Sequence, residues 1–144
     1  MATEEKKKMT GADLNYTASM SGGLVYREHA FYPQFTYTEG VRYLAEECNC
    51  FWLLDVIASH QPKVINKLCA IGSRNFQVWL IEKQGRRGVR VTCWHDEPNK
   101  SMKLAAQRIP FSDLAEHFDL DQGPIKLYVE TSGRDMRLMI PAER

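Results

Sequence analysis

The residues of this chain that could do chemistry begin with its cysteines and histidines. The candidate metal ligands are Cys48, Cys50, Cys69, Cys93, His60 and His95. Thiolate and imidazole suit zinc, but structural zinc sites usually separate paired cysteines by about two to four residues, and here one residue separates Cys48 from Cys50. In a helix, residues two apart also diverge by about 200°. We therefore expect buried free thiols, no metal site and no cofactor.

A cysteine beside a histidine could instead act as a thiolate–imidazole nucleophile. Cys69 or Cys93 with His60 or His95 could form such a pair. No catalytic signature surrounds either cysteine, and Cys93 alternates with apolar residues, which favours packing over reactivity. A small hydrolase or thiol enzyme is therefore the third function that we consider, and no residue is assigned a catalytic role.

A carboxylate, Asp55, interrupts the most apolar segment of the chain, between Leu54 and Val56. In such a segment it must be paired, hydrogen-bonded or on an exposed edge. One interpretation is an acid or base with a perturbed pKa. We expect the other, an ion pair or a hydrogen bond to a nearby loop.

A basic hairpin suggests nucleic-acid binding as an alternative function. Its cationic residues are Lys83, Arg86, Arg87 and Arg90. Aromatic side chains beside cations are typical of single-strand binding. The whole chain, however, has 19 Lys and Arg against 18 Asp and Glu, and a net charge of +1 creates no long-range field for nucleic acid or an anionic membrane.

Two amphipathic helices are predicted in the first half of the chain. The first has apolar residues at i, i+3, i+4 and i+7, namely Val41, Leu44, Ala45 and Cys48. Thr38 is its expected N-cap, with a capping box of Thr36 and Glu39 as the alternative. The second runs over 51–60 and ends before Pro62.

Alternating apolar residues then predict strands over 76–81, 89–94, 102–109, 125–129 and 136–140. A tight turn at 85–86 suits a type II′ loop and would pair Leu80 with Val91 and Val78 with Cys93. This register leaves one sheet face aromatic, and the candidate interface residues on it are Trp79, Ile81, Trp94, Arg90 and Tyr128.

Helices followed by strands indicate an α+β fold, with two N-terminal helices packed on one face of a mostly antiparallel sheet of about five strands. Residues 1–23 are polar and are expected to form a flexible N-terminal tail, and 24–144 to form a single α+β domain. The expected shared core is Trp52, Leu53, Val56, Ile57, Val78, Leu80, Val91, Leu127 and Leu138.

The composition also gives an expectation about location. No apolar run approaches the roughly 20 residues that cross a bilayer, and no apolar stretch follows the charged N-terminus as in a signal peptide. We expect a cytoplasmic protein with reduced cysteines and no membrane partner.

Five segments together resemble a family of short bacterial and mobile-element proteins catalogued only as a domain of unknown function. They are Thr38 to Ala45, Trp52 to Ser59, Phe76 with Trp79, Ile109 to Asp113, and Leu138 to Glu143. The chain departs from that pattern in its longer N-terminal tail, at Ala142 and in the stretch 114–123. The resemblance implies one domain and no particular activity.

From these observations we expect a protein-interaction module that associates with itself or with a partner through the aromatic sheet face. Nucleic-acid binding through the basic hairpin is the alternative.

Overall fold

The computed structural model describes residues 8–20, 27–29, 32, 34–72, 75–96, 102–132 and 135–144. At the centre of this part of the chain is a seven-stranded sheet with the strand order β1-β2-β7-β6-β3-β4-β5. Only β2 and β7 run parallel in it, and the other described neighbours are antiparallel. The strands are β1 (Arg27–Glu28), β2 (Phe35–Tyr37), β3 (Phe76–Gln84), β4 (Gly88–Trp94), β5 (Lys103–Ile109), β6 (Ile125–Ser132) and β7 (Asp135–Met139).

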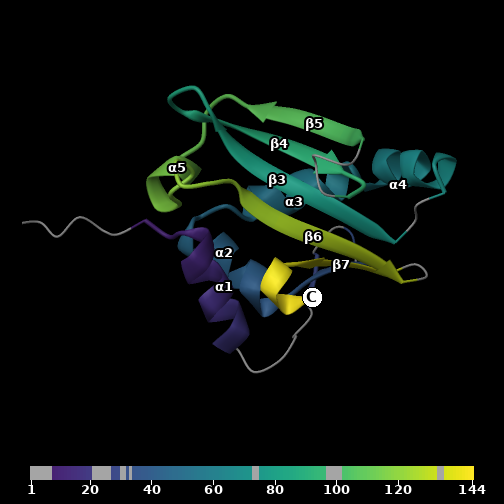
Figure 1. The fold of residues 1–144 in the computed structure, drawn as a ribbon, viewed down its shortest axis with the longest axis horizontal. Helices are drawn as coiled ribbons and strands as arrows, with labels where there is room; N and C mark the ends of the chain where they lie inside the picture. The colour runs from purple at the N-terminus through teal and green to yellow at the C-terminus, as the bar shows by residue number, and fades with distance from the viewer. Residues whose placement is uncertain are drawn as a thin grey trace, which may run out of the picture.

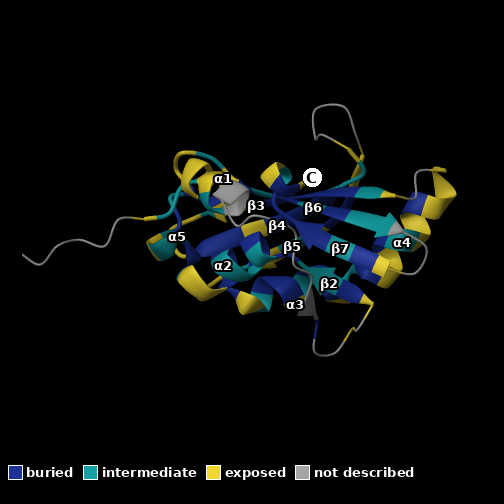
Figure 2. Ribbon diagram, turned by 90° about the horizontal axis from the view of Figure 1, so that it is seen from below, coloured by how far each residue is buried: buried dark blue, intermediate teal, exposed yellow. Residues whose placement is uncertain are grey.

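Helices flank the sheet on both sides. They are α1 (Gly11–Met20), α2 (Glu39–Glu47), α3 (Phe51–Ser59), α4 (Gln61–Ala70), α5 (Leu114–His117) and the 3-10 turn η2 (Pro141–Glu143). Figure 1 shows these elements coloured from purple at the N-terminus to yellow at the C-terminus. Figure 2 shows the strands between α2 and α3 on one side and α1 with the C-terminal turn on the other. We call the side toward α2 and α3 the helix face, and the opposite side the outer face.

The predicted α+β class is therefore confirmed, but its details are only roughly matched. The sheet has more than five strands, and a third helix, α4, follows the two expected ones. β1 and β2 are two and three residues long, too short to show an alternating pattern. The parallel partner of β2, β7, lies about a hundred residues away along the chain, because Phe35 pairs with Met136.

The β3–β4 register differs from the prediction by one residue. Gln84 pairs with Gly88, so the turn contains Gly85, Arg86 and Arg87 rather than two residues. A one-residue shift moves every side chain to the opposite face of a sheet. Gly85 takes a φ of 68°, a left-handed conformation that glycine adopts without strain.

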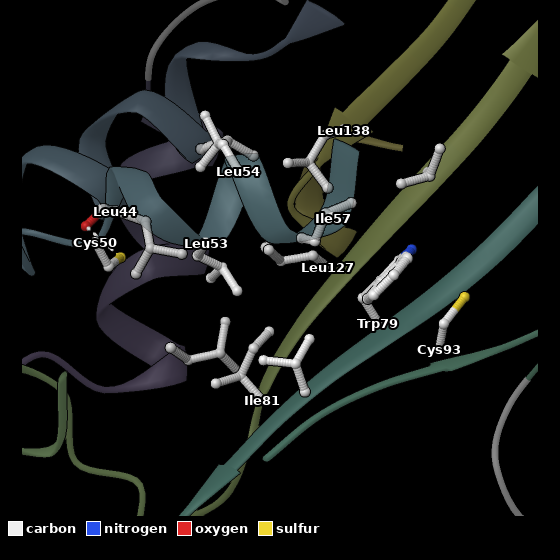
Figure 3. Packing of buried hydrophobic residues seen from close by; sticks show 14 of the residues in the cluster. Leu44, Cys50, Leu53, Leu54, Ile57, Trp79, Ile81, Cys93, Leu127 and Leu138 are labelled. Carbon is white, nitrogen blue, oxygen red and sulfur yellow. Dashed lines mark hydrogen bonds between the residues drawn. The ribbon is translucent and has the colours of Figure 1, made fainter. Parts of the chain in front are cut away.

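This shift corrects the predicted aromatic face. Trp79 pairs with Cys93 and points to the helix face, whereas Trp94 pairs with Val78 on the outer face. Figure 3 shows Trp79 and Ile81 in the packed layer that includes Leu53 and Ile57 of α3. The prediction that Trp79 and Trp94 lie on the same face is wrong, because the turn is one residue longer than assumed.

The predicted core is only partly the observed one. Leu53, Ile57, Val91, Leu127 and Leu138 belong to the buried cluster. Trp52 and Val56 are partly buried at its margin. Val78 and Leu80 are also buried, but the corrected register places them on the outer face.

A buried amide pair fixes the orientation of Trp79. Gln61 and Gln77 exchange two hydrogen bonds, of 3.0 and 2.8 Å. Gln77 Oε1 also accepts from Trp79 Nε1 at 2.9 Å, and Gln61 Nε2 donates to the Ile57 carbonyl at 3.2 Å. Because buried polar groups are costly when unpaired, this network favours the arrangement that joins α4, α3 and β3.

Part of the predicted tail is ordered. Residues 11–20 form α1, whose Leu14 is buried in the core, while 1–7 and 21–26 lie outside the described residues. Met9 also forms an isolated bridge with Phe118. Among the described residues, no helix is long and apolar enough to cross a membrane.

The side-chain carboxylate of Glu143, near the C-terminus, caps α2. Thr38 is the N-cap, as predicted, and its hydroxyl accepts from Val41 N at 3.4 Å. The same hydroxyl donates to Glu143 Oε1 at 2.5 Å, and Glu143 Oε2 accepts from Gly40 N at 3.2 Å. Ile140 N donates a third hydrogen bond to this carboxylate, to Glu143 Oε1 at 2.9 Å. A negative charge at a helix N-terminus is also favourable toward the helix dipole.

We predict that Glu143→Ala destabilises the protein by about 3 kcal/mol, because it leaves three buried donors without their acceptor. Gly40→Ala should also destabilise it, since a Cβ there would lie 2.7 Å from Glu143 Oε1. Chemical denaturation measures both, with Gly11→Ala as the control because its Cβ would meet nothing within 4 Å.

In the double variant the cost of Gly40→Ala should largely disappear, because the atom it contacts has gone. Strictly additive losses would contradict this account of the contact.

Candidate functional site

The predicted interface residues are divided between the two faces of the sheet. Trp79 is 1% exposed and Ile81 is fully buried, so neither can contact a partner in the folded chain. Trp94, Arg90 and Tyr128 share the outer face. Tyr128 is partly covered there, with the Arg144 guanidinium 5.8 Å from its ring centre.

The predicted basic cluster is divided as well. Lys83 points to the helix face and lies 3.3 Å from Asp121 Oδ1. Arg86 and Arg87 are exposed in the turn, and Arg90 is exposed on the outer face. These four cations therefore do not form one continuous surface.

The described cysteines and histidines do not form a cluster that could hold a metal ion. Among the residues that the structure describes, no group of three or more His, Cys, Asp and Glu side chains is arranged to hold a metal ion. Cys48 and Cys50 are buried at the α2–α3 corner, on either side of Asn49, which has a φ of 50°. His60 Nε2 lies 2.7 Å from Gln107 Oε1, and His95 Nδ1 accepts from Met102 N at 3.0 Å.

Two of the thiols are electrostatically unsuited to nucleophilic chemistry. Burial raises the pKa of Cys50 to about 12. Burial also raises the pKa of Cys93 well above its usual range, although the Lys67 charge opposes this. A thiol that stays protonated is a poor nucleophile.

Asp55 forms a hydrogen bond, one of the two contacts expected of it. Its Oδ1 lies 2.6 Å from Nε2 of His29, which is buried, whereas the Asp55 side chain is 64% exposed. His29 also packs beside the rings of Tyr32 and Phe35. The pair therefore fastens the segment around β1 to α3.

An open groove of about 890 Å³ lies on the described surface. Its lining residues are Asn49, Trp52, Val56, Arg87, Ile109, Phe111, Ser112, Asp113 and Glu116. Figure 1 shows the β3–β4 turn, the end of β5 and α5 at the same end of the sheet. We call this hollow the Phe111 groove.

Phe111 is the most exposed large apolar side chain of the described residues, at 77%. The turn that carries it is held in place, because Ser112 N donates to the Arg87 carbonyl at 2.7 Å and Leu114 N to Ser112 Oγ at 3.1 Å. Trp52 and Val56 of α3 provide a partly buried apolar wall. The groove thus combines a projecting aromatic ring with an apolar recess.

The groove also contains charge of both signs. Arg87 and Glu116 both line it and are exposed, and neither forms an ion pair within the described residues. Asp113, which also lines the groove, has its Oδ2 3.5 Å from Nε2 of His117.

The Phe111 groove was missed in the sequence. Ile109 to Asp113 was recognised only as part of a resemblance, and an aromatic residue in a turn has no periodicity that reveals its exposure.

We predict that an aromatic disulfide reagent labels Cys69 of the folded protein rapidly, because Cys69 is exposed. With a pKa of about 12, only about one Cys50 thiol in ten thousand is ionised near pH 8. Cys50 and Cys93 should therefore react only after unfolding, and Cys69→Ser should remove the fast phase. Rapid labelling of Cys93 in folded Cys69→Ser protein would contradict the burial argument.

Comparison with known proteins adds a family but no activity. No match was found among curated proteins or solved structures. A family model described as "Family of unknown function (DUF6876)" matches residues 14–144, which include α1 from Leu14 onward, the groove and the Glu143 cap. The chain belongs to the DUF6876 family of unknown function.

Proposed function

We propose that this protein is a protein-interaction module that self-associates through the Phe111 groove. The observation that carries the proposal is Phe111, 77% exposed on a hydrogen-bonded turn beside an apolar recess. Solvent exposure of a large ring on an ordered turn is unfavourable, and contiguous exposed apolar surface commonly marks an association site.

A second copy of the chain suits the groove because the ring and the recess are adjacent. In a two-fold arrangement the same patch serves both subunits, so Phe111 of each copy can enter the recess of the other. That recess is formed by Trp52, Val56 and Ile109. The residues of the patch are thus complementary to themselves.

Charge supports the same occupant. Arg87 and Glu116 lie in one groove without ion-pair partners in the described chain. Two-fold pairing can bring Arg87 of one copy to Glu116 of the other, twice per dimer. A strongly acidic or basic partner would meet both signs of charge and would gain less.

The expected affinity is modest. Burial of two Phe111 rings contributes roughly 3 to 6 kcal/mol, whereas association costs at least about 4 kcal/mol in lost translational and rotational freedom. The remaining contacts must supply the net stabilisation. We therefore propose a concentration-dependent dimer rather than an obligate one.

Sedimentation equilibrium over a wide concentration range tests the dimer. Phe111→Ala should weaken association by at least about 2 kcal/mol, or about 30-fold. It should leave thermal stability unchanged, since the ring is exposed. Phe51→Ala is the matched control, because Phe51 is 45% exposed and does not line the groove.

A charge-swap experiment tests the two-fold geometry. Arg87→Glu and Glu116→Arg should each prevent self-association through like-charge contacts. An equimolar mixture of the two variants should associate again, because each heterodimer then contains one native and one reversed pair. A wild-type protein that is monomeric at every concentration, or a mixture that stays monomeric, would rule out this dimer.

A further inference from the structure

Two arginines lie directly opposite each other on the outer face. Arg90 of β4 pairs in register with Arg108 of β5, and both are exposed. Residues opposite each other in antiparallel strands have Cβ atoms about 5 Å apart, where like charges repel. Within the described part of the chain, neither guanidinium has a hydrogen-bonding or ion-pair partner. A bound anion would turn this repulsion into a bridge.

An aromatic ring lies on the same face and the same strand. Trp94 Nε1 donates to Thr92 Oγ1 at 3.0 Å, which directs the indole back along β4. Trp94 is partly exposed and pairs with Lys103. Its Cα is about 13 Å from that of Arg90, four residues along an extended strand.

Thr92 and Ala106 form the row of the sheet between these groups. Thr92 is buried and pairs with Ala106, the smallest side chain of that row. A ligand could therefore extend past the small, exposed side chain of Ala106 between the arginines and the indole. Lys103 adds a cation at the Trp94 end.

We propose that this outer face binds single-stranded nucleic acid, with Arg90 and Arg108 on a phosphate and Trp94 stacked on a base. Guanidinium groups match the geometry of phosphate oxygens. An aromatic ring on a sheet can stack only on a base that is not already stacked in a duplex. The site differs from the hairpin cluster considered in the sequence, because it keeps Arg90, omits Lys83, Arg86 and Arg87, and gains Arg108.

One carboxylate opposes this site and provides an internal test. Glu82 of β3 is exposed and lies opposite Arg90 on its other side. Its negative charge repels phosphate and should limit affinity. Glu82→Gln should therefore strengthen binding, whereas loss of either arginine should weaken it.

The experiment is fluorescence anisotropy of a labelled oligothymidylate, titrated with the full chain between about 50 and 200 mM salt. Arg90→Ala and Arg108→Ala should each lower the affinity, and the double variant should reduce the slope of log affinity against log salt by about 0.7, the value for one phosphate contact. Trp94→Ala should weaken binding about 10-fold at all salt concentrations, with rescue by Trp94→Phe. Thermal unfolding shows whether each variant is folded.

Lys83→Gln is the matched control, because it removes one positive charge from the same hairpin but on the helix face. It should leave the affinity unchanged. Phe111→Ala should also leave it unchanged when the oligothymidylate is too short to reach the outer face of a second copy, which separates this proposal from the dimer.

Several outcomes would overturn the site. One is that wild-type protein does not bind at low salt, and another is that Lys83→Gln weakens binding as much as Arg108→Ala. Equal affinity for duplex DNA, inorganic polyphosphate or phosphatidylserine vesicles, with no effect of Trp94→Ala, would show an unspecific polyanion surface instead.

Discussion

One buried carboxylate joins the C-terminal end of the family-matched region to the start of α2. Glu143 holds the hydroxyl of Thr38 and the amides of Gly40 and Ile140. The lack of a Cβ at Gly40 is what lets the carboxylate approach the first turn of α2, where any side chain would overlap it. β7 leads directly into this contact, and Thr38 N donates to the Leu138 carbonyl at 3.2 Å. The parallel β2–β7 pair and the start of α2 are therefore held together by one set of hydrogen bonds.

The position of α2 also determines the shape of the Phe111 groove, because α2 leads into α3, which carries one wall of the groove. α2 ends at a corner where Asn49 adopts a left-handed conformation, and the flanking Cys48 and Cys50 are buried on either side. The corner sets the direction of α3 and hence the position of Trp52. The opposite wall is placed by the hydrogen bond from Ser112 N to the Arg87 carbonyl. Since the walls come from separate layers of the fold, the groove persists only while both are packed.

Features that depend on local sequence patterns were predicted correctly. Features that depend on contacts between distant residues, or on the exact register of two strands, were not. The apolar stripes of α2 and α3 and the Thr38 cap are local, and they were found. The bond from Thr38 to Glu143 spans 105 positions and has no local pattern. Similarly, one extra residue in the 85–87 turn reversed both faces of β3 relative to β4, because alternation shows that faces exist but not which pairs match.

That same register separates the two proposed surfaces, which would bind their partners through different interactions. It places Trp79 beneath the helices and leaves Trp94 on the outer face that also carries Arg90, and Trp94 does not line the Phe111 groove. Association by apolar burial persists as salt rises, whereas phosphate contacts weaken steeply. A dimer formed through the groove would carry two outer faces, so a strand long enough to span both would bind with an effective concentration set by their separation. Self-association and strand binding would then reinforce each other without a shared residue.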